Sequence, residues 1–148
     1  MNFKKIKKFL IYLLPWFISA ILFRSNTSYY NSLNLPIIAP PPILFALIWP
    51  ILYLLIAYSI YNTYEDSTNT YKKTLLINYI SNQLFSFFFF TIKTNFLSLI
   101  DTIIVLISSI YLLKETNNIN KKYSKYLIPY IIWNIFATIL ILTILVMN

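Results

Sequence analysis

The chain has 148 residues, of which 59% are apolar, 19% aromatic and only 11% charged. This composition excludes a soluble globular domain, whose surface needs far more charge, and predicts an integral membrane protein. Because the sequence holds no Cys and no His, disulfides, thiolate chemistry, zinc sites and histidine-ligated haem are excluded, and we expect neither a metal nor a cofactor.

The net charge of +8 could indicate nucleic-acid binding, but the positions of the basic residues argue against that partner. Ten of them fall in alternate connections between apolar stretches: Lys4, Lys5, Lys7, Lys8, Lys72, Lys73, Lys114, Lys121, Lys122 and Lys125. Only Arg24 and Lys93 fall in the other connections. The positive-inside rule then predicts a cytoplasmic N-terminus and an outer C-terminus, with anionic membrane lipid attracted to the lysines.

Five apolar stretches follow one another, and each is long enough to cross a bilayer as an α-helix. They are Phe9–Phe23, Ile43–Tyr61, Leu75–Ile92, Phe96–Leu113 and Leu127–Met147. None shows the alternation of a membrane β-barrel. We therefore predict an all-α, integral membrane five-helix bundle that forms a single domain over residues 1–148.

The first stretch has a second interpretation, since a lysine-rich start followed by apolar residues also suits a cleavable signal peptide. Ile18-Ser19-Ala20 is a poor cleavage site, and Pro15-Trp16 interrupts the middle of the apolar run. We interpret residues 9–23 as the first helix of the bundle.

The segment 24–42 is predicted to be a loop on the outer side. It contains four prolines, at positions 36, 40, 41 and 42. Because proline fixes φ and pushes the preceding residue toward extended geometry, we expect no helix before Ile43.

Eight positions from this loop into the second helix form a pattern: Tyr30, Leu33, Pro36, Pro40, Pro41, Phe45, Trp49 and Tyr53. The pattern resembles, without a gap, the loop and second-helix signature of the TspO/MBR family, the tryptophan-rich sensory or translocator proteins. Tyr29, Leu35 and Ile38 depart from it, because the family usually has Trp, Lys and Trp there.

The third helix carries a polar stripe at spacings of three and four residues: Asn78, Ser81, Asn82 and Ser86, with Gln83 a quarter turn away. In lipid such a stripe must face protein or a cavity, so it serves either as interhelical hydrogen bonding or as a ligand site. The segment 78–86 is similar to the third-helix motif of bacterial members of the family. The resemblance implies that Asn82, Gln83 and the aromatic Phe85 line a ligand pocket, with Phe85 standing where many members have Trp.

Asp101 stands alone among apolar residues of the fourth helix. A carboxylate within a membrane is a functional candidate, but this one is close enough to the helix start for the macrodipole and nearby water to stabilise it. The family also has an Asp here. A single carboxylate cannot run paired acid and base chemistry.

The last helix contains Trp133, Phe136, Ala137 and Leu140 on one face, and the second helix places Trp49 and Tyr53 on one face. Membrane tryptophans are most often interfacial anchors. Trp49 and Trp133 lie about six residues inside their apolar runs, which favours a pocket. The segment 127–138 is similar to the last helix of the family.

The connections are expected to be polar and irregular. Residues 62–74 are predicted to be a solvated link, and residues 117–125 a mobile cytoplasmic loop. The link around residues 91–95 is so short that the helices on either side must be antiparallel neighbours.

The resemblance implies a protein of a bacterial cell membrane, with a cavity that binds porphyrin-like ligands such as protoporphyrin IX, a sensory role, and a homodimer. The residues expected at the ligand site are Tyr30, Pro40, Trp49, Tyr53, Asn82, Gln83, Phe85, Asp101, Trp133, Phe136 and Ala137. Two other hypotheses remain open. In the first, the protein is a catalyst of light- and oxygen-dependent porphyrin breakdown through Trp49 and Trp133. In the second, it is a transporter or a structural bundle.

Overall fold

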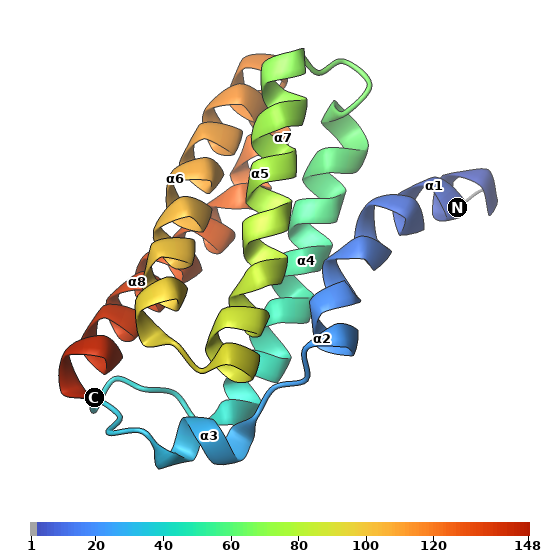
Figure 1. Cartoon of the computed structure of the whole chain (residues 1–148). Coiled ribbons are helices and arrows are strands. Elements are labelled where there is room, and N and C mark those ends of the chain that lie inside the picture. Colours follow the sequence, from blue (N-terminus) through green and yellow to red (C-terminus); the bar gives the residue numbers. More distant parts are fainter. Residues whose placement is uncertain (1–2) are drawn as a thin grey trace.

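A computed structural model describes residues 3–148, which fold into helices joined by short links (Figure 1). In chain order the elements are α1 (Phe3–Leu13), the 3₁₀ turn η1 (Leu14–Phe17), α2 (Ile18–Leu22), α3 (Thr27–Ser32), α4 (Pro42–Thr63), α5 (Asn69–Ser86), the π-helical η2 (Phe87–Ile92), α6 (Asn95–Ile119), α7 (Lys121–Ser124), the 3₁₀ turn η3 (Lys125–Leu127) and α8 (Ile128–Met147). The part of the chain described contains no strand. The all-α prediction is confirmed.

Within residues 3–148, four helical segments are long and apolar enough to cross a membrane. They are Pro42–Thr63, Asn69–Ile92, Asn95–Ile119 and Lys121–Met147. α5 packs on α6 and α6 packs on α8, while α1 packs on α4 and α2 on α5 (Figure 1). The bundle therefore has four membrane-length helices rather than the expected five. The first segment is instead divided into α1, η1 and α2.

The single helix expected over residues 9–23 is wrong, because the helical turns from Phe3 to Leu22 are interrupted by η1. Pro15 lacks the N–H that an α-helix needs at that position, which accounts for the break. Side chains of α5 supply hydrogen bonds there instead. The Tyr79 hydroxyl donates to the Pro15 carbonyl at 3.0 Å, and the Gln83 side chain accepts from Ser19 N–H at 2.8 Å and donates to the Trp16 carbonyl at 3.3 Å.

The segment 24–42 contains a helix, α3, so the expectation of no helix before Ile43 is wrong. Asn26 caps α3 by accepting a hydrogen bond from Tyr29 N–H at 2.9 Å, an interaction typical of helix starts. The prolines act only on the later part of the loop. α4 begins at Pro42, because proline is well accommodated in the first turn of a helix.

The polar connections are also shorter and more helical than predicted. α4 continues to Thr63, and α5 begins at Asn69 after Thr68, whose hydroxyl accepts from Tyr71 N–H at 3.1 Å. Residues 117–125, expected to be a mobile loop, instead complete α6 and form α7. Asn120 caps α7 by accepting from Lys122 N–H at 3.0 Å.

The link between η2 and α6 is short, as expected, and makes a tight turn at Lys93. This residue adopts a left-handed conformation with φ 59°, which is uncommon outside glycine. η2 and α6 contact each other directly, so the two neighbours are packed against one another after the turn.

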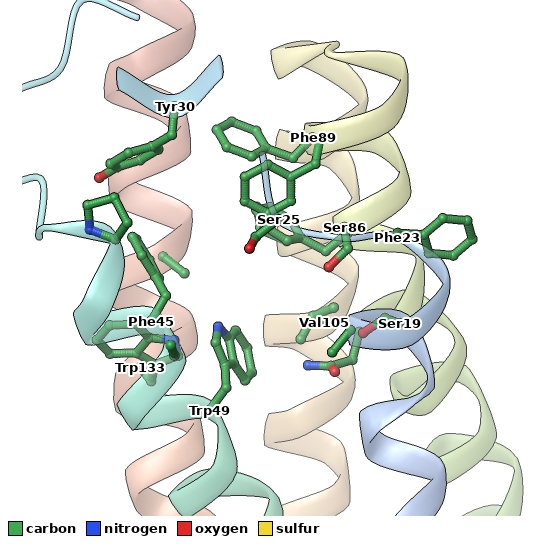
Figure 2. A pocket seen from close by; sticks show the side chains of 18 of the residues that line it. Ser19, Phe23, Ser25, Tyr30, Phe45, Trp49, Ser86, Phe89, Val105 and Trp133 are labelled. Carbon is green, nitrogen blue, oxygen red and sulfur yellow. The ribbon is translucent and has the colours of Figure 1, made fainter. Parts of the chain in front are cut away.

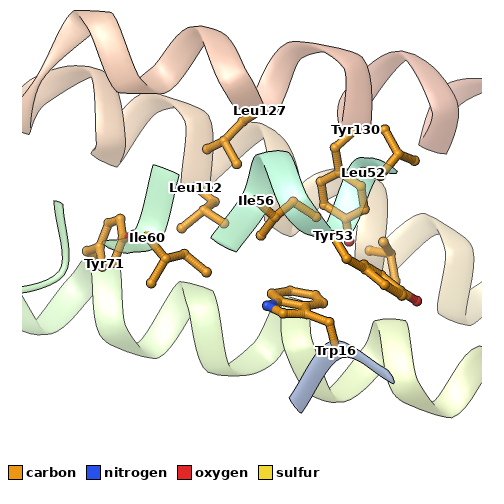
Figure 3. Close-up of a cluster of buried hydrophobic side chains, with 10 residues drawn as sticks. Trp16, Leu52, Tyr53, Ile56, Ile60, Tyr71, Leu112, Leu127 and Tyr130 are labelled. Carbon is orange, nitrogen blue, oxygen red and sulfur yellow. The ribbon is translucent and has the colours of Figure 1, made fainter. Parts of the chain in front are cut away.

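The hydrophobic core consists of two clusters. One lies among α4, α5, α6, η3 and α8, toward the lysine-rich end, and includes Ile56, Leu112, Leu127 and Tyr130, with Trp16 from η1 packed beneath them (Figure 3). The other lies at the opposite end and contains Tyr30, Phe89, Leu140, Ile141 and Ile144. The cavity described below is bordered by residues from both clusters.

Candidate ligand cavity

A cavity of about 570 Å³ lies inside the bundle, toward the end that carries α3 (Figure 2). Its walls come from η1, α2, α3, α4, α5, η2, α6 and α8. The volume falls within the roughly 300–1,000 Å³ typical of small-molecule sites.

Two indole rings form one wall. Trp49 of α4 and Trp133 of α8 both line the cavity, with ring centroids 6.4 Å apart and planes at 89° (Figure 2). Phe45 lies edge-on to Trp133 at 5.9 Å, and Tyr53 lies 5.5 Å from Trp49. The edge-to-face contacts of Trp133 with Phe45 and Trp49, and the tilted contact of Trp49 with Tyr53, hold the indoles in place and leave apolar ring surface facing the cavity.

A second aromatic wall comes from α5 and η2. Phe85 and Phe89 are stacked with centroids 5.5 Å apart and an angle of 13° between their planes. The π-helical turns of η2 carry Phe89 toward the same end of the cavity as Tyr30 (Figure 2).

Tyr30 connects the loop to the cavity mouth. Its hydroxyl donates a hydrogen bond to the Pro40 carbonyl at 2.9 Å, and its ring lies 5.6 Å from Phe45. Burial raises the pKa of the Tyr30 phenol, so the group stays neutral and remains a donor. α3 and the proline segment are therefore joined across the cavity mouth.

Asn82 supplies an amide to the cavity wall and also joins three helices. It accepts from the Tyr53 hydroxyl of α4 at 3.2 Å and donates to the Tyr130 oxygen of α8 at 3.1 Å. Asn78, one turn earlier, is hydrogen-bonded to Ser108 at 2.9 Å and does not line the cavity. The polar stripe of α5 thus serves interhelical bonding at Asn78, whereas Asn82 makes interhelical bonds and also lines the cavity.

Two donors of α8 are buried without a hydrogen-bond partner among the residues described. They are Trp133 Nε1 and Asn134 Nδ2, and both residues line the cavity. Buried polar groups are normally paired, so these donors are the ones that could orient acceptor atoms of a bound ligand.

A proline inside α4 removes one helical hydrogen bond next to the cavity. Pro50 lies inside α4 and cannot donate the helical hydrogen bond to the carbonyl of Ala46. Both residues line the cavity.

Of the residues expected at the ligand site, those that line this cavity are Tyr30, Trp49, Tyr53, Asn82, Phe85, Trp133 and Ala137. Four others lie outside its wall: Pro40, Gln83, Asp101 and Phe136. Pro40 is bonded to Tyr30, Gln83 holds the broken first segment, and Phe136 packs 5.2 Å from Trp133. Asp101 is buried in α6 behind the cavity.

The first segment contributes wall residues that the sequence reasoning missed, namely Phe17, Ser19, Ala20 and Phe23. The signal for them was Pro15-Trp16, since a break in the helix redirects the residues that follow. Asn134 was also missed, although it lies next to Trp133. The residues described contain no cluster of three or more His, Cys, Asp or Glu side chains, the kind of cluster that holds a tightly bound transition metal.

Together, the apolar helices and the aromatic cavity define an integral membrane protein of the helical type, with an internal cavity lined by aromatic residues. A model of the TspO/MBR family matches residues 9–147. The chain is 38% identical over 136 residues to "Tryptophan-rich protein TspO" of Bacillus cereus, a match that covers 90% of this chain and 89% of that protein. It is 37% identical over 131 residues to "Uncharacterized membrane protein YtaB" of Bacillus subtilis, covering 86% and 84%. The chain belongs to the TspO/MBR family.

Proposed function

We propose that this protein binds a flat apolar ligand of the porphyrin type in its cavity and serves a sensory or regulatory role in the membrane. The observation that carries the proposal is the cavity of about 570 Å³ with two perpendicular indoles on one wall and stacked phenyl rings on another. Aromatic walls suit a flat macrocycle, and a few polar groups orient it.

Polar groups at the cavity wall favour binding of a ligand that has carboxylate or carbonyl oxygens over binding of a plain hydrocarbon. The unpartnered donors of Trp133 and Asn134 would meet acceptor atoms of the ligand. Leaving buried donors unpaired costs about 1–3 kcal/mol each, so a ligand that accepts from them gains affinity over one that cannot.

Titration of the purified protein in detergent with protoporphyrin IX tests this proposal. We expect red-shifted porphyrin absorbance and quenched tryptophan fluorescence. The Ala137→Phe variant places a phenyl ring in the cavity and should weaken both signals strongly, whereas Ile139→Phe, on the exposed side of the same helix, should leave them unchanged. Equal binding by both variants would place the porphyrin elsewhere.

A second candidate function is light- and oxygen-dependent breakdown of the porphyrin. The observation that favours it is that two oxidisable indoles line one cavity with centroids 6.4 Å apart. Illumination of the complex, followed by chromatography of the pigment, separates this activity from binding alone.

A further inference from the structure

A second polar site lies between α5, α6 and α8, behind the cavity wall. Its centre is Asp101 of α6, which is 3% exposed. Ser81 of α5 and Tyr130 of α8 lie close enough to this carboxyl group to interact with it electrostatically.

The polar neighbours of Asp101 are already committed to other hydrogen bonds. The Tyr130 hydroxyl donates to Asn78 Oδ1 at 3.1 Å and accepts from Asn82 Nδ2 at 3.1 Å. Asn78 Nδ2 donates to Ser108 Oγ at 2.9 Å. Among the residues described, Asp101 Oδ2 is left buried with no partner.

Among residues 3–148, no Lys or Arg forms an ion pair with this carboxylate. α8 contains no Lys or Arg, and the basic residues of α5 and α6 are Lys72, Lys73 and Lys114, toward the lysine-rich ends of these helices. The facing titratable groups are the phenols Tyr130 of α8 and, through Asn82, Tyr53 of α4. The other tyrosine of this part of α5, Tyr79, is bonded to the Pro15 carbonyl instead.

An unpaired carboxylate in a membrane interior is costly, so its charge must be neutralised by something that enters from outside. The cavity provides the approach. Thr102, next to Asp101 in the chain, lines the cavity, and so does Asn134, whose Nδ2 is also unpartnered. We propose that Asp101 is the anionic group of an intramembrane monovalent-cation site, which holds a proton or a sodium ion. This site does not depend on which ligand the cavity takes.

Infrared spectroscopy of the full chain in detergent tests for the proton. In sodium-free choline buffer, a protonated Asp101 gives a carboxylic-acid C=O band that shifts in D₂O. Asp101→Asn should lose the band and keep the wild-type melting temperature, because the amide resembles a neutral carboxyl in size and polarity. Asp66→Asn, at an exposed position, is the matched control and should keep the band.

Replacing choline with sodium at constant ionic strength tests for the ion. A bound sodium ion would raise the melting temperature of the wild type with concentration, as expected for a ligand specific to the folded state, and would do so less or not at all in Asp101→Asn. The sodium series and the D₂O shift are read on the wild type, so they stand even if the variant fails to fold. A wild type with neither a carboxylic-acid band nor a sodium response carries a bare carboxylate, and that result overturns the proposal. A band that persists in Asp101→Asn, without a sodium response, also overturns it.

Discussion

Trp49 and Trp133 differ in what they offer a ligand, although their rings are neighbours. Trp133 has a buried indole N–H without a partner among the residues described, and Phe136 and Phe45 pack against its ring. Trp49 packs on Tyr53 and Tyr130. Both present apolar ring surface, but Trp133 also presents a donor.

We predict that Trp49→Phe and Trp133→Phe each weaken porphyrin binding by no more than about 1 to 2 kcal/mol, because an aromatic face remains. Light-dependent breakdown should fall much further, since a phenyl ring is far harder to oxidise than an indole. Absorbance titration measures the first effect and pigment chromatography after illumination the second. If the double variant degraded porphyrin at the parental rate, the tryptophans would have no part in the chemistry.

Asn82 and Gln83 are adjacent in sequence but act on different parts of the molecule. Asn82 lines the cavity and bonds Tyr53 and Tyr130, whereas Gln83 bonds the backbone of Trp16 and Ser19. Gln83→Leu would leave a buried backbone donor and acceptor unpaired.

We therefore expect Gln83→Leu to destabilise the fold by about 1–3 kcal/mol, the usual cost of unpaired buried groups. Porphyrin affinity should fall with it, because η1 and α2 form part of the wall. Asn82→Leu should lower affinity more than stability. Thermal unfolding and titration on both variants give the comparison, and an unchanged melting temperature for Gln83→Leu would contradict the role given to that side chain.

At the scale of elements, α3 and the proline segment act as one cover. The Tyr30 hydroxyl bonds the Pro40 carbonyl within the cover, and the Tyr30 ring lies 5.6 Å from Phe45 of α4. Asn34, two residues after α3, bonds the end of the chain: its N–H donates to Asn148 Oδ1 at 2.8 Å, and its Nδ2 donates to the Met147 carbonyl of α8 at 3.3 Å. The cover is thus fixed at both α4 and α8.

Tyr30→Phe removes the hydrogen bond and keeps the ring. We expect a loss of about 0.5–1.5 kcal/mol in unfolding free energy, the net value of one hydrogen bond, and faster ligand release because the cover opens more often. Stopped-flow release of porphyrin measures the rate. Ser32→Ala, which removes an exposed hydrogen bond within α3, is the control and should release ligand at the wild-type rate.

The sequence predicted the three long apolar helices α4, α6 and α8 well, because their apolar runs are continuous and bounded by polar residues. The break at Pro15 was visible, but its consequence depends on Tyr79 and Gln83, some 64 residues away, and such pairings cannot be deduced from periodicity. Periodicity places Asn82 on the polar face of its helix. It does not reveal that Gln83 bonds the backbone of Trp16 and Ser19, because that contact joins distant parts of the chain. The sequence prediction omitted α3, because the prolines of the loop indicate extended backbone. The N-cap at Asn26, which allows a helix before those prolines, was not included.

At the scale of the whole molecule, charge is concentrated at one end of the bundle. The end that joins α4 to α5 carries Lys8, bonded to Glu65 at 2.6 Å. α7 lies at the same end, where its Tyr123 packs 6.0 Å from Tyr58 of α4. Lys93 lies at the opposite end, with its Nζ 5.5 Å from the Tyr29 ring.

This asymmetry leads us to predict that the lysine-rich end faces the cytoplasm and the covered mouth of the cavity faces outward, since cytoplasmic connections carry the excess of Lys and Arg. A phosphatase fused after Asn148 should be active on the outer side, and a fluorescent protein inserted after Asp66 should fold in the cytoplasm. Replacing Lys4, Lys5, Lys7 and Lys8 with Gln should produce a mixed orientation, because it removes four of the ten charges that set it. The opposite reporter pattern in the wild type would mean that the cavity opens toward the cytoplasm, and that a ligand reaches Tyr30 and α3 from inside the cell.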